Sequence, residues 1–147
     1  MTIAQRHTAF FRMADKDMAA TATLVLNQLA EKLQQSCHLA VRQENGFRVV
    51  FQSAPSTSFY VNMPVGLVYQ APATVDGVAQ AGQQPNPSLP DVIDFYAPVF
   101  QAGEQVALLI APYIKRRGAP PLEQCRDAMM AAAKHLSASA ITHALVA

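Results

Sequence analysis

The first third of the chain has the hydrophobic spacing of an amphipathic helix. Apolar side chains recur every three or four positions, at Phe11, Ala14, Met18, Ala22, Val25, Leu29 and Leu33. Polar residues such as Asn27 and Glu31 lie off this stripe. The pattern predicts a helix over residues 8–35, with Thr8 as its N-cap.

The spacing then changes to alternation, which is typical of strands. Between His38 and Phe51 the apolar residues flank Asn45-Gly46, a common hairpin turn. A three-residue loop pairs Val41 with Val49 and places the large apolar side chains of both strands on one face, whereas a two-residue loop divides them between faces. We therefore predict a hairpin with the three-residue loop and with Gly46 in a left-handed conformation.

No residue from Val49 to Val75 carries a charge. Within this stretch, residues 59–63 and 67–69 alternate around the turn Pro64-Val65-Gly66, which predicts a third and a fourth strand. A membrane span needs about 20 predominantly apolar residues, and proline, asparagine and glutamine interrupt this one. The uncharged stretch is therefore interpreted as a buried sheet face.

All ten prolines lie between Pro55 and Pro121, and the segments on either side are proline-free. Residues 71–91 are rich in proline and glutamine and are predicted to form an exposed loop. A helix is expected to begin at Ser88. Residues 104–114 fit a helix or a buried strand, and helix is favoured. The last helix is predicted to begin at Pro120-Pro121.

These elements predict one α+β domain over residues 1–147. It would contain the N-terminal amphipathic helix, an antiparallel β-meander of three to four strands, and two or three C-terminal helices packed on the sheet. A chain of 147 residues is long enough to bury a core without disulfides or a metal.

Charge is scarce, because charged residues make up only 14% of the chain and the net charge is +1. This balance gives no general attraction to nucleic acid or to anionic lipid, so neither is expected as a partner. The two cysteines have no metal-type spacing, and the N-terminus lacks the apolar run of a signal peptide. We therefore expect a cytoplasmic protein with no metal and no cofactor.

Three groups of residues have the right types for chemistry. Cys37-His38 suggests a nucleophile and a base, but adjacent strand residues point to opposite faces. Asp91 and Asp94 lie one turn apart on the expected helix, where acidic residues also serve the helix dipole. The basic run at residues 115–117 equally suits a helix C-terminus. No catalytic motif is present, so catalysis is not expected.

Aromatic and amide side chains supply the best candidates for ligand contacts. Those of the predicted third and fourth strands would lie on the sheet face away from the first helix, where they could form a groove or lie under a second helix. The candidate ligand-binding residues are Tyr60, Asn62, Tyr69, Tyr96 and Tyr113.

Two functions are compatible with these features. The first is a small cytoplasmic binding or adaptor protein without catalytic activity, which forms a homodimer through helix or sheet-edge contacts and binds a protein or a small apolar ligand. The alternative is a small-molecule-binding domain or enzyme whose pocket lies between the sheet and the loop at 71–91.

Overall fold

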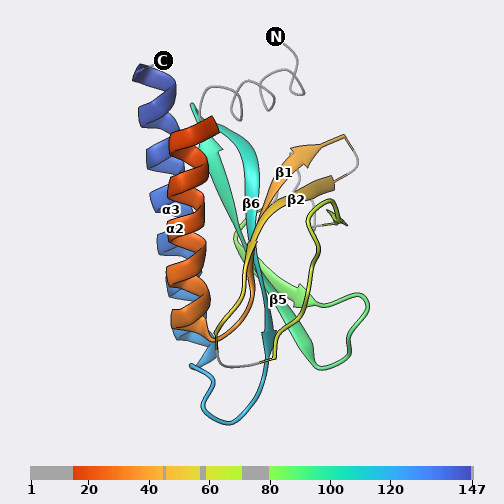
Figure 1. Ribbon diagram of the computed structural model, residues 1–147. Helices are drawn as coiled ribbons and strands as arrows, with labels where there is room; N and C mark the ends of the chain where they lie inside the picture. Colours follow the sequence, from red (N-terminus) through yellow and green to blue (C-terminus); the bar gives the residue numbers. More distant parts are fainter. Residues whose placement is uncertain (1–14, 45, 57–58, 71–79, 147) are drawn as a thin grey trace.

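The computed structural model describes residues 15–44, 46–56, 59–70 and 80–146 (Figure 1). A long helix lies at each end of this part of the chain, α2 (Asp15–Leu33) and α3 (Leu122–Val146). Between the helices are the strands β1 (Cys37–Gln43), β2 (Gly46–Ser53), β3 (Val68–Tyr69), β4 (Gly82–Pro85), β5 (Val92–Gln101) and β6 (Glu104–Ile114).

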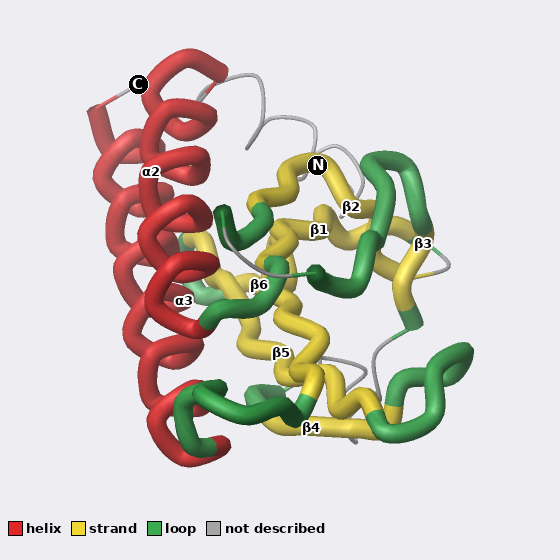
Figure 2. The backbone as a smooth tube through the Cα atoms, turned by 60° about the horizontal axis from the view of Figure 1, so that its bottom comes forward, coloured by secondary structure: helices red, strands yellow, loops and turns green. Residues whose placement is uncertain are grey.

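The strands form one antiparallel six-stranded sheet in the order β3-β2-β1-β6-β5-β4. The short strands β3 and β4 are therefore its two edges. Figures 1 and 2 show α2 and α3 side by side on one face of a strongly curled sheet. Neither described helix lies on the opposite face of the sheet, which we call the helix-free face.

The main core lies between the sheet and the two helices. Alternate residues of the central strands, such as Leu39 and Leu109, meet Leu26 of α2 and Leu136 of α3, and all four are buried. Each large apolar side chain buried in this way contributes about 1.5–3 kcal/mol. The predicted helix is confirmed over Asp15–Leu33, and its apolar stripe is confirmed at Ala22, Leu29 and Leu33; residues 8–14 lie outside the described residues.

The predicted register of the β1–β2 hairpin is only partly right. The predicted three-residue loop is wrong, because Gly46 pairs with Gln43, and Val41 therefore pairs with Arg48 rather than Val49. A bulge after Leu39 then shifts the register, so that Leu39 pairs with Phe51 as expected. Val49 pairs with Ala40 and faces away from the helices, whereas the bulge lets Phe51 face the helices together with Leu39. The large side chains are therefore divided between the two faces. Both faces of this hairpin are buried, which removes the reason for preferring the three-residue loop.

The prediction of two further strands in the uncharged stretch is wrong for its first half. Residues 59–63 form no strand, and only Val68–Tyr69 pairs with β2. The turn that begins at Pro64 is hydrogen-bonded to Val49 on β2. The N–H of Val49 donates to the carbonyl of Leu67 at 2.8 Å, and the N–H of Gly66 donates to the carbonyl of Val49 at 2.8 Å. Residues 61–63 thereby lie over the helix-free face rather than beside β2, and Met63 packs on it.

The predicted helices at Ser88 and at residues 104–114 are wrong, because both segments belong to the long hairpin β5–β6. Its turn is Ala102-Gly103, with φ angles of 51° and 80°. Two residues with positive φ make the tight turn that suits the twist of a hairpin. The helix-like spacing of Val92, Tyr96 and Val99 arises because β5 is apolar on both faces.

Two prolines lie inside this hairpin at places where they cost no ladder bond. Pro98 lies beyond the end of β4, and Pro112 lies beyond the end of β1. Two residues after each proline, the backbone N–H donates to a side-chain oxygen, that of Ser137 on α3 (2.9 Å) or of Gln35 after α2 (3.0 Å). Side chains therefore continue the pairing where the neighbouring strand has ended.

The α+β class, the antiparallel sheet and the last helix are confirmed, with α3 beginning directly after Pro121. The expected three to four strands are six, and in the described part of the chain one helix rather than two or three follows the sheet. Of the expected loop at 71–91, residues 71–79 lie outside the described residues and Gly82–Pro85 form β4. Neither described helix is long and apolar enough to cross a membrane.

Candidate functional site

The helix-free face holds a second, smaller core with polar groups beside it. Val61 packs against the edge of this core. Its buried apolar residues come from five strands and from the segment at residues 61–63 that crosses them: Ala40, Phe47, Val49, Met63, Tyr69, Tyr96, Leu108 and Ile110. Among the described residues, Met63 and Tyr69 cover this face, and neither α2 nor α3 does.

The structure brings two of the five candidate residues together on this face. Tyr69 and Tyr96 are both buried in its core. Tyr60 and Asn62 are exposed on the crossing segment. Tyr113 lies on the opposite face, where its ring meets Phe95 edge-on at 5.9 Å and its hydroxyl donates to the carbonyl of Pro120.

Tyr69 takes part in a hydrogen-bond network that joins the two edges of the curled sheet. Its hydroxyl donates to Asp94 Oδ2 on β5 at 3.0 Å and accepts from Gln84 Nε2 on β4 at 2.7 Å. Asn86 Nδ2 donates to Asp94 Oδ1 at 3.0 Å. We call these four residues the edge clasp, because they connect β3 at one edge with β4 at the other.

Asp94 is a fully buried carboxyl group whose bonds in the described structure come only from neutral groups. Burial raises its pKa above the ordinary value, and the hydrogen bonds from Asn86 and Tyr69 offset part of that rise. Burial, and then the neighbouring Asp94, raise the pKa of the Tyr69 phenol. The clasp therefore favours a protonated phenol beside a carboxyl group that is costly to ionise.

His38 supplies the second unusual polar group on this face. It is completely buried, and it pairs with Ile110 between Cys37 and Leu39, which face the helices. Its Nδ1 lies 3.3 Å from the carbonyl oxygen of Ile110. A carbonyl only accepts, so Nδ1 carries the hydrogen and Nε2 is left as an acceptor.

His38 Nε2 has no hydrogen-bond partner within the described part of the chain. Burial lowers the pKa of the imidazole to about 4, and the bond to Ile110 offsets only part of that effect. The ring is therefore neutral near pH 7. A buried polar atom without a partner costs about 1–3 kcal/mol, and such atoms often mark a place that another molecule fills.

Most of these residues could not be identified from the sequence. Asp91 and Asp94 do not form the expected pair, because Asp91 is exposed at the turn before β5 while Asp94 is buried within it. Gln84 and Asn86 were part of a predicted loop, and nothing in their spacing distinguished them from its other polar residues. The separation of Cys37 from His38 by strand alternation is confirmed.

The other candidate groups have structural roles. Burial raises the pKa of both free thiols, Cys37 and Cys125, which makes them poor nucleophiles. Arg116, in the basic run, donates to the carbonyl of Gln34 directly after α2, so it serves the C-terminus of that helix. The described residues contain no cluster of histidine, cysteine and acidic side chains able to hold a metal ion.

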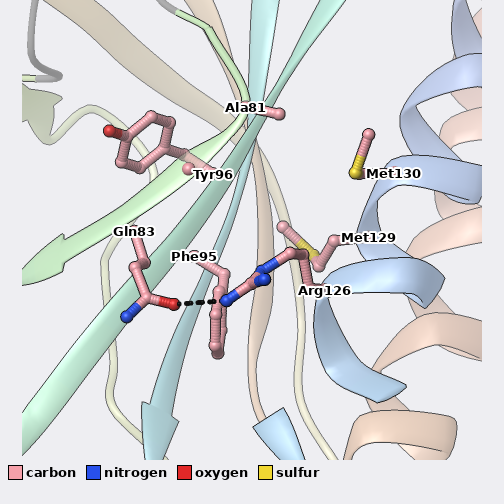
Figure 3. Close-up of a pocket in the computed structure, with 8 residues that line it drawn as sticks. Ala81, Gln83, Phe95, Tyr96, Arg126, Met129 and Met130 are labelled. Atoms are coloured by element: carbon pink, nitrogen blue, oxygen red, sulfur yellow. Dashed lines mark hydrogen bonds between the residues drawn. The ribbon is translucent and has the colours of Figure 1, made fainter. Parts of the chain in front are cut away.

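A cavity of about 280 Å³ lies on the other side of β4, between that edge strand and α3 (Figure 3). Its lining residues are Ala81, Gly82, Gln83, Phe95, Tyr96, Arg126, Met129 and Met130. In Figure 3 the ring of Tyr96 points away from α3, while Gln83 and Arg126 meet at the cavity. β4 thus contributes Gln84 to the edge clasp and Gly82 and Gln83 to the lining of this cavity.

No protein-family model matches the sequence, and no curated protein matches it. Solved structures do resemble the fold. A protein described as an IclR transcriptional regulator from Silicibacter sp. matches with a TM-score of 0.70 and 16% identity over 91% of this chain and 70% of its own. HmgR from Pseudomonas aeruginosa matches with a TM-score of 0.68 and 18% identity, over 94% of this chain and 73% of its own.

A third similar structure contains a ligand. It is an IclR homologue from Microbacterium hydrocarbonoxydans complexed with 4-hydroxybenzoate, with a TM-score of 0.67 and 10% identity, over 90% of this chain and 69% of that one. At these identities the likeness is one of fold. The shared fold gives no support to the expectation that nucleic acid is not a partner.

Proposed function

We propose that this chain is a small-molecule-binding domain of the kind found in transcriptional regulators, with its ligand on the helix-free face beside His38 and the edge clasp. The observation that carries the proposal is the completely buried His38 ring with an unpartnered Nε2. A folded protein that needed only a core at this position would avoid that cost with an apolar side chain.

The polar groups define the chemistry of the ligand. Nε2 of neutral His38 accepts a hydrogen bond, so the ligand supplies an O–H or N–H donor. Asp94 lies on the same face in surroundings that disfavour its ionised form, and an anionic group placed next to it would be disfavoured for the same reason. The ligand end that enters this face is therefore a neutral group with an O–H or N–H donor, attached to an apolar body.

The comparisons support this class of ligand. One protein of the same fold is complexed with 4-hydroxybenzoate, which carries a phenolic hydroxyl on an aromatic ring. The apolar rings and side chains around Tyr69 and Tyr96 suit such a body. Binding there would act on the edge clasp, because Tyr69 belongs to both the apolar core and the clasp.

Native mass spectrometry of the purified chain, combined with thermal shifts in a set of hydroxyl-bearing aromatics, tests the proposal. We expect a bound small molecule, or a raised melting temperature with one member of the set, in the wild type and in the exposed control variant Tyr60→Phe. His38→Phe should abolish the effect, because it removes the acceptor. A chain that neither carries nor responds to any such molecule would refute the proposal.

We further propose that the domain forms a homodimer through the β3 edge, as the adaptor interpretation also required. Three large apolar side chains are exposed in and directly before that edge strand: Val65 (61%), Leu67 (40%) and Val68 (40%). An edge strand with apolar neighbours suits pairing with a second copy. Light scattering should give twice the chain mass, and Val68→Lys should give the single mass; a wild-type monomer at about 100 μM would contradict the proposal.

A further inference from the structure

We infer that the cavity between β4, β5 and α3 is a second binding site, which takes a small single-ring molecule carrying one carboxylate. This inference is independent of the function proposed for the helix-free face. It rests on the cavity, on its apolar walls and on one guanidinium group placed at it (Figure 3).

The walls of the cavity are apolar and adaptable. Phe95 and Met129 are buried and form its inner side, while Met130 leaves 50% of its surface exposed. Methionine side chains adjust to irregular shapes and pack favourably against aromatic rings. An apolar body in the cavity would cover the exposed surface of Met130, so the walls favour a ring rather than a sugar or another strongly hydrated molecule.

The polar end of the cavity is Arg126. Its Nη2 donates to Gln83 Oε1 at 3.1 Å, which links α3 to β4. Glu123 and Asp127 lie nearby on the same helix, but within the described part of the chain neither forms an ion pair with Arg126. The guanidinium is thus bonded to a neutral amide, although its charge would make a stronger bond to an anion.

A carboxylate would make stronger hydrogen bonds to Arg126 and Gln83 than these two side chains make to each other. Guanidinium has N–H donors that suit the two oxygens of a carboxylate, and the amide NH₂ of Gln83 can donate to the same group. Charge-assisted bonds are roughly twice as strong as neutral ones. Arg126 and Gln83 are both exposed, so the exchange of their bond for bonds to a carboxylate is favourable when the ring of the ligand fills the cavity and excludes water from the guanidinium.

The size of the cavity is sufficient for a small ligand such as a single-ring carboxylate. Its volume of about 280 Å³ is just below the range of roughly 300–1,000 Å³ that is usual for small-molecule sites. Gly82 belongs to this fit, because a Cβ there would lie 3.0 Å from the hydroxyl of Tyr96 and would push β4 or that ring aside.

Isothermal titration with benzoate and with its neutral analogue benzamide tests the inference. We expect benzoate to bind the wild type about 10- to 100-fold more tightly than benzamide, the difference that one charge-assisted contact makes. Arg126→Gln should remove this preference, and Met130→Glu should weaken benzoate by placing a like charge on the wall. The matched control Arg48→Gln, an exposed arginine on β2, should keep the preference.

Three results would overturn the inference: no binding of benzoate at about 10 mM, equal affinities for benzoate and benzamide, or unchanged benzoate binding in Arg126→Gln. The variant Asp94→Asn separates this site from the helix-free face, because it should leave benzoate binding unchanged. Loss of benzoate binding in Asp94→Asn, with retention in Arg126→Gln, would place benzoate on the helix-free face and would also count against the second site.

Discussion

The buried imidazole of His38 makes the stability of the protein depend on pH in a defined direction. Its pKa is about 4 in the folded chain and 6.5 at its ordinary value. Between these values the unfolded chain binds a proton that the native chain does not, so this residue's contribution to stability falls as the pH is lowered through that window. Linkage gives a loss of about 2 kcal/mol between pH 7 and pH 5.

Asp94 acts in the opposite direction and must be separated from His38. Its raised pKa means that the folded chain keeps a proton that the unfolded chain has lost, so its contribution is present at low pH and is lost as the pH rises through its folded pKa. The wild-type curve mixes both groups. The difference between the wild type and His38→Gln isolates the histidine, because Asp94 is present in both proteins.

Urea unfolding of the wild type and of His38→Gln at pH 5, 6 and 7 measures this difference. We expect the free energy of unfolding of the wild type, relative to the variant, to fall by about 2 kcal/mol from pH 7 to pH 5. The glutamine amide of the variant can still donate to the carbonyl of Ile110, so the comparison changes mainly the titrating group. The exposed His135 gives the matched control, and His135→Gln should follow the wild type.

A wild-type-minus-variant difference that stays constant from pH 5 to pH 7 would rule out the buried neutral imidazole. It would mean that the ring accepts a proton in the folded chain, and hence that Nε2 has a partner or is reached by water. The same result would remove the observation on which the binding proposal for the helix-free face depends.

Two further predictions concern the clasp and the hairpin. Tyr69→Phe removes one buried and one partly buried hydrogen bond and should lower the free energy of unfolding by about 2 kcal/mol at pH 7. Tyr96→Phe should cost less than about 0.5 kcal/mol, and equal losses in urea melts would contradict a role for the clasp. Gly46→Ala places a Cβ 2.7 Å from the carbonyl oxygen of Tyr69 at a φ of 142° and should cost about 2 kcal/mol. Gly66→Ala, with a φ of 99° and open space around the glycine, should cost about half as much. A larger loss of stability in Gly66→Ala than in Gly46→Ala would show that the contact between Gly46 and β3 does not limit the side chain at residue 46.

The sequence predicted the elements whose hydrophobic period was unambiguous. The helix stripe of Leu29 and Leu33 and the proline start of α3 needed only local information. The hairpin β5–β6 could not be predicted in this way, because β5 is buried on both faces and its apolar residues do not alternate with polar ones. In addition, Ala-Gly, the dipeptide at residues 102–103, is a weaker sequence signal for a hairpin turn than Asn-Gly is.

The site was less predictable than the fold, because it is assembled from the two edges of the sheet. Tyr69 and Asp94 are 25 positions apart, and they meet only because the sheet curls. Tyr69 and Tyr96 were identified as aromatic candidates, but Asp94 was assigned to a helix. His38 was considered only as a partner for Cys37, since no pattern in one sequence reveals that a buried ring nitrogen will lack a partner.

Binding of a small molecule to the helix-free face can be observed directly by a fragment screen followed by amide ¹H–¹⁵N correlation spectra of the whole chain. We predict that phenol-like fragments shift amides around His38, Tyr69 and Asp94, and that His38→Phe abolishes these shifts. Shifts that never include those amides, or that persist unchanged in His38→Phe, would show that the ligand does not bind there.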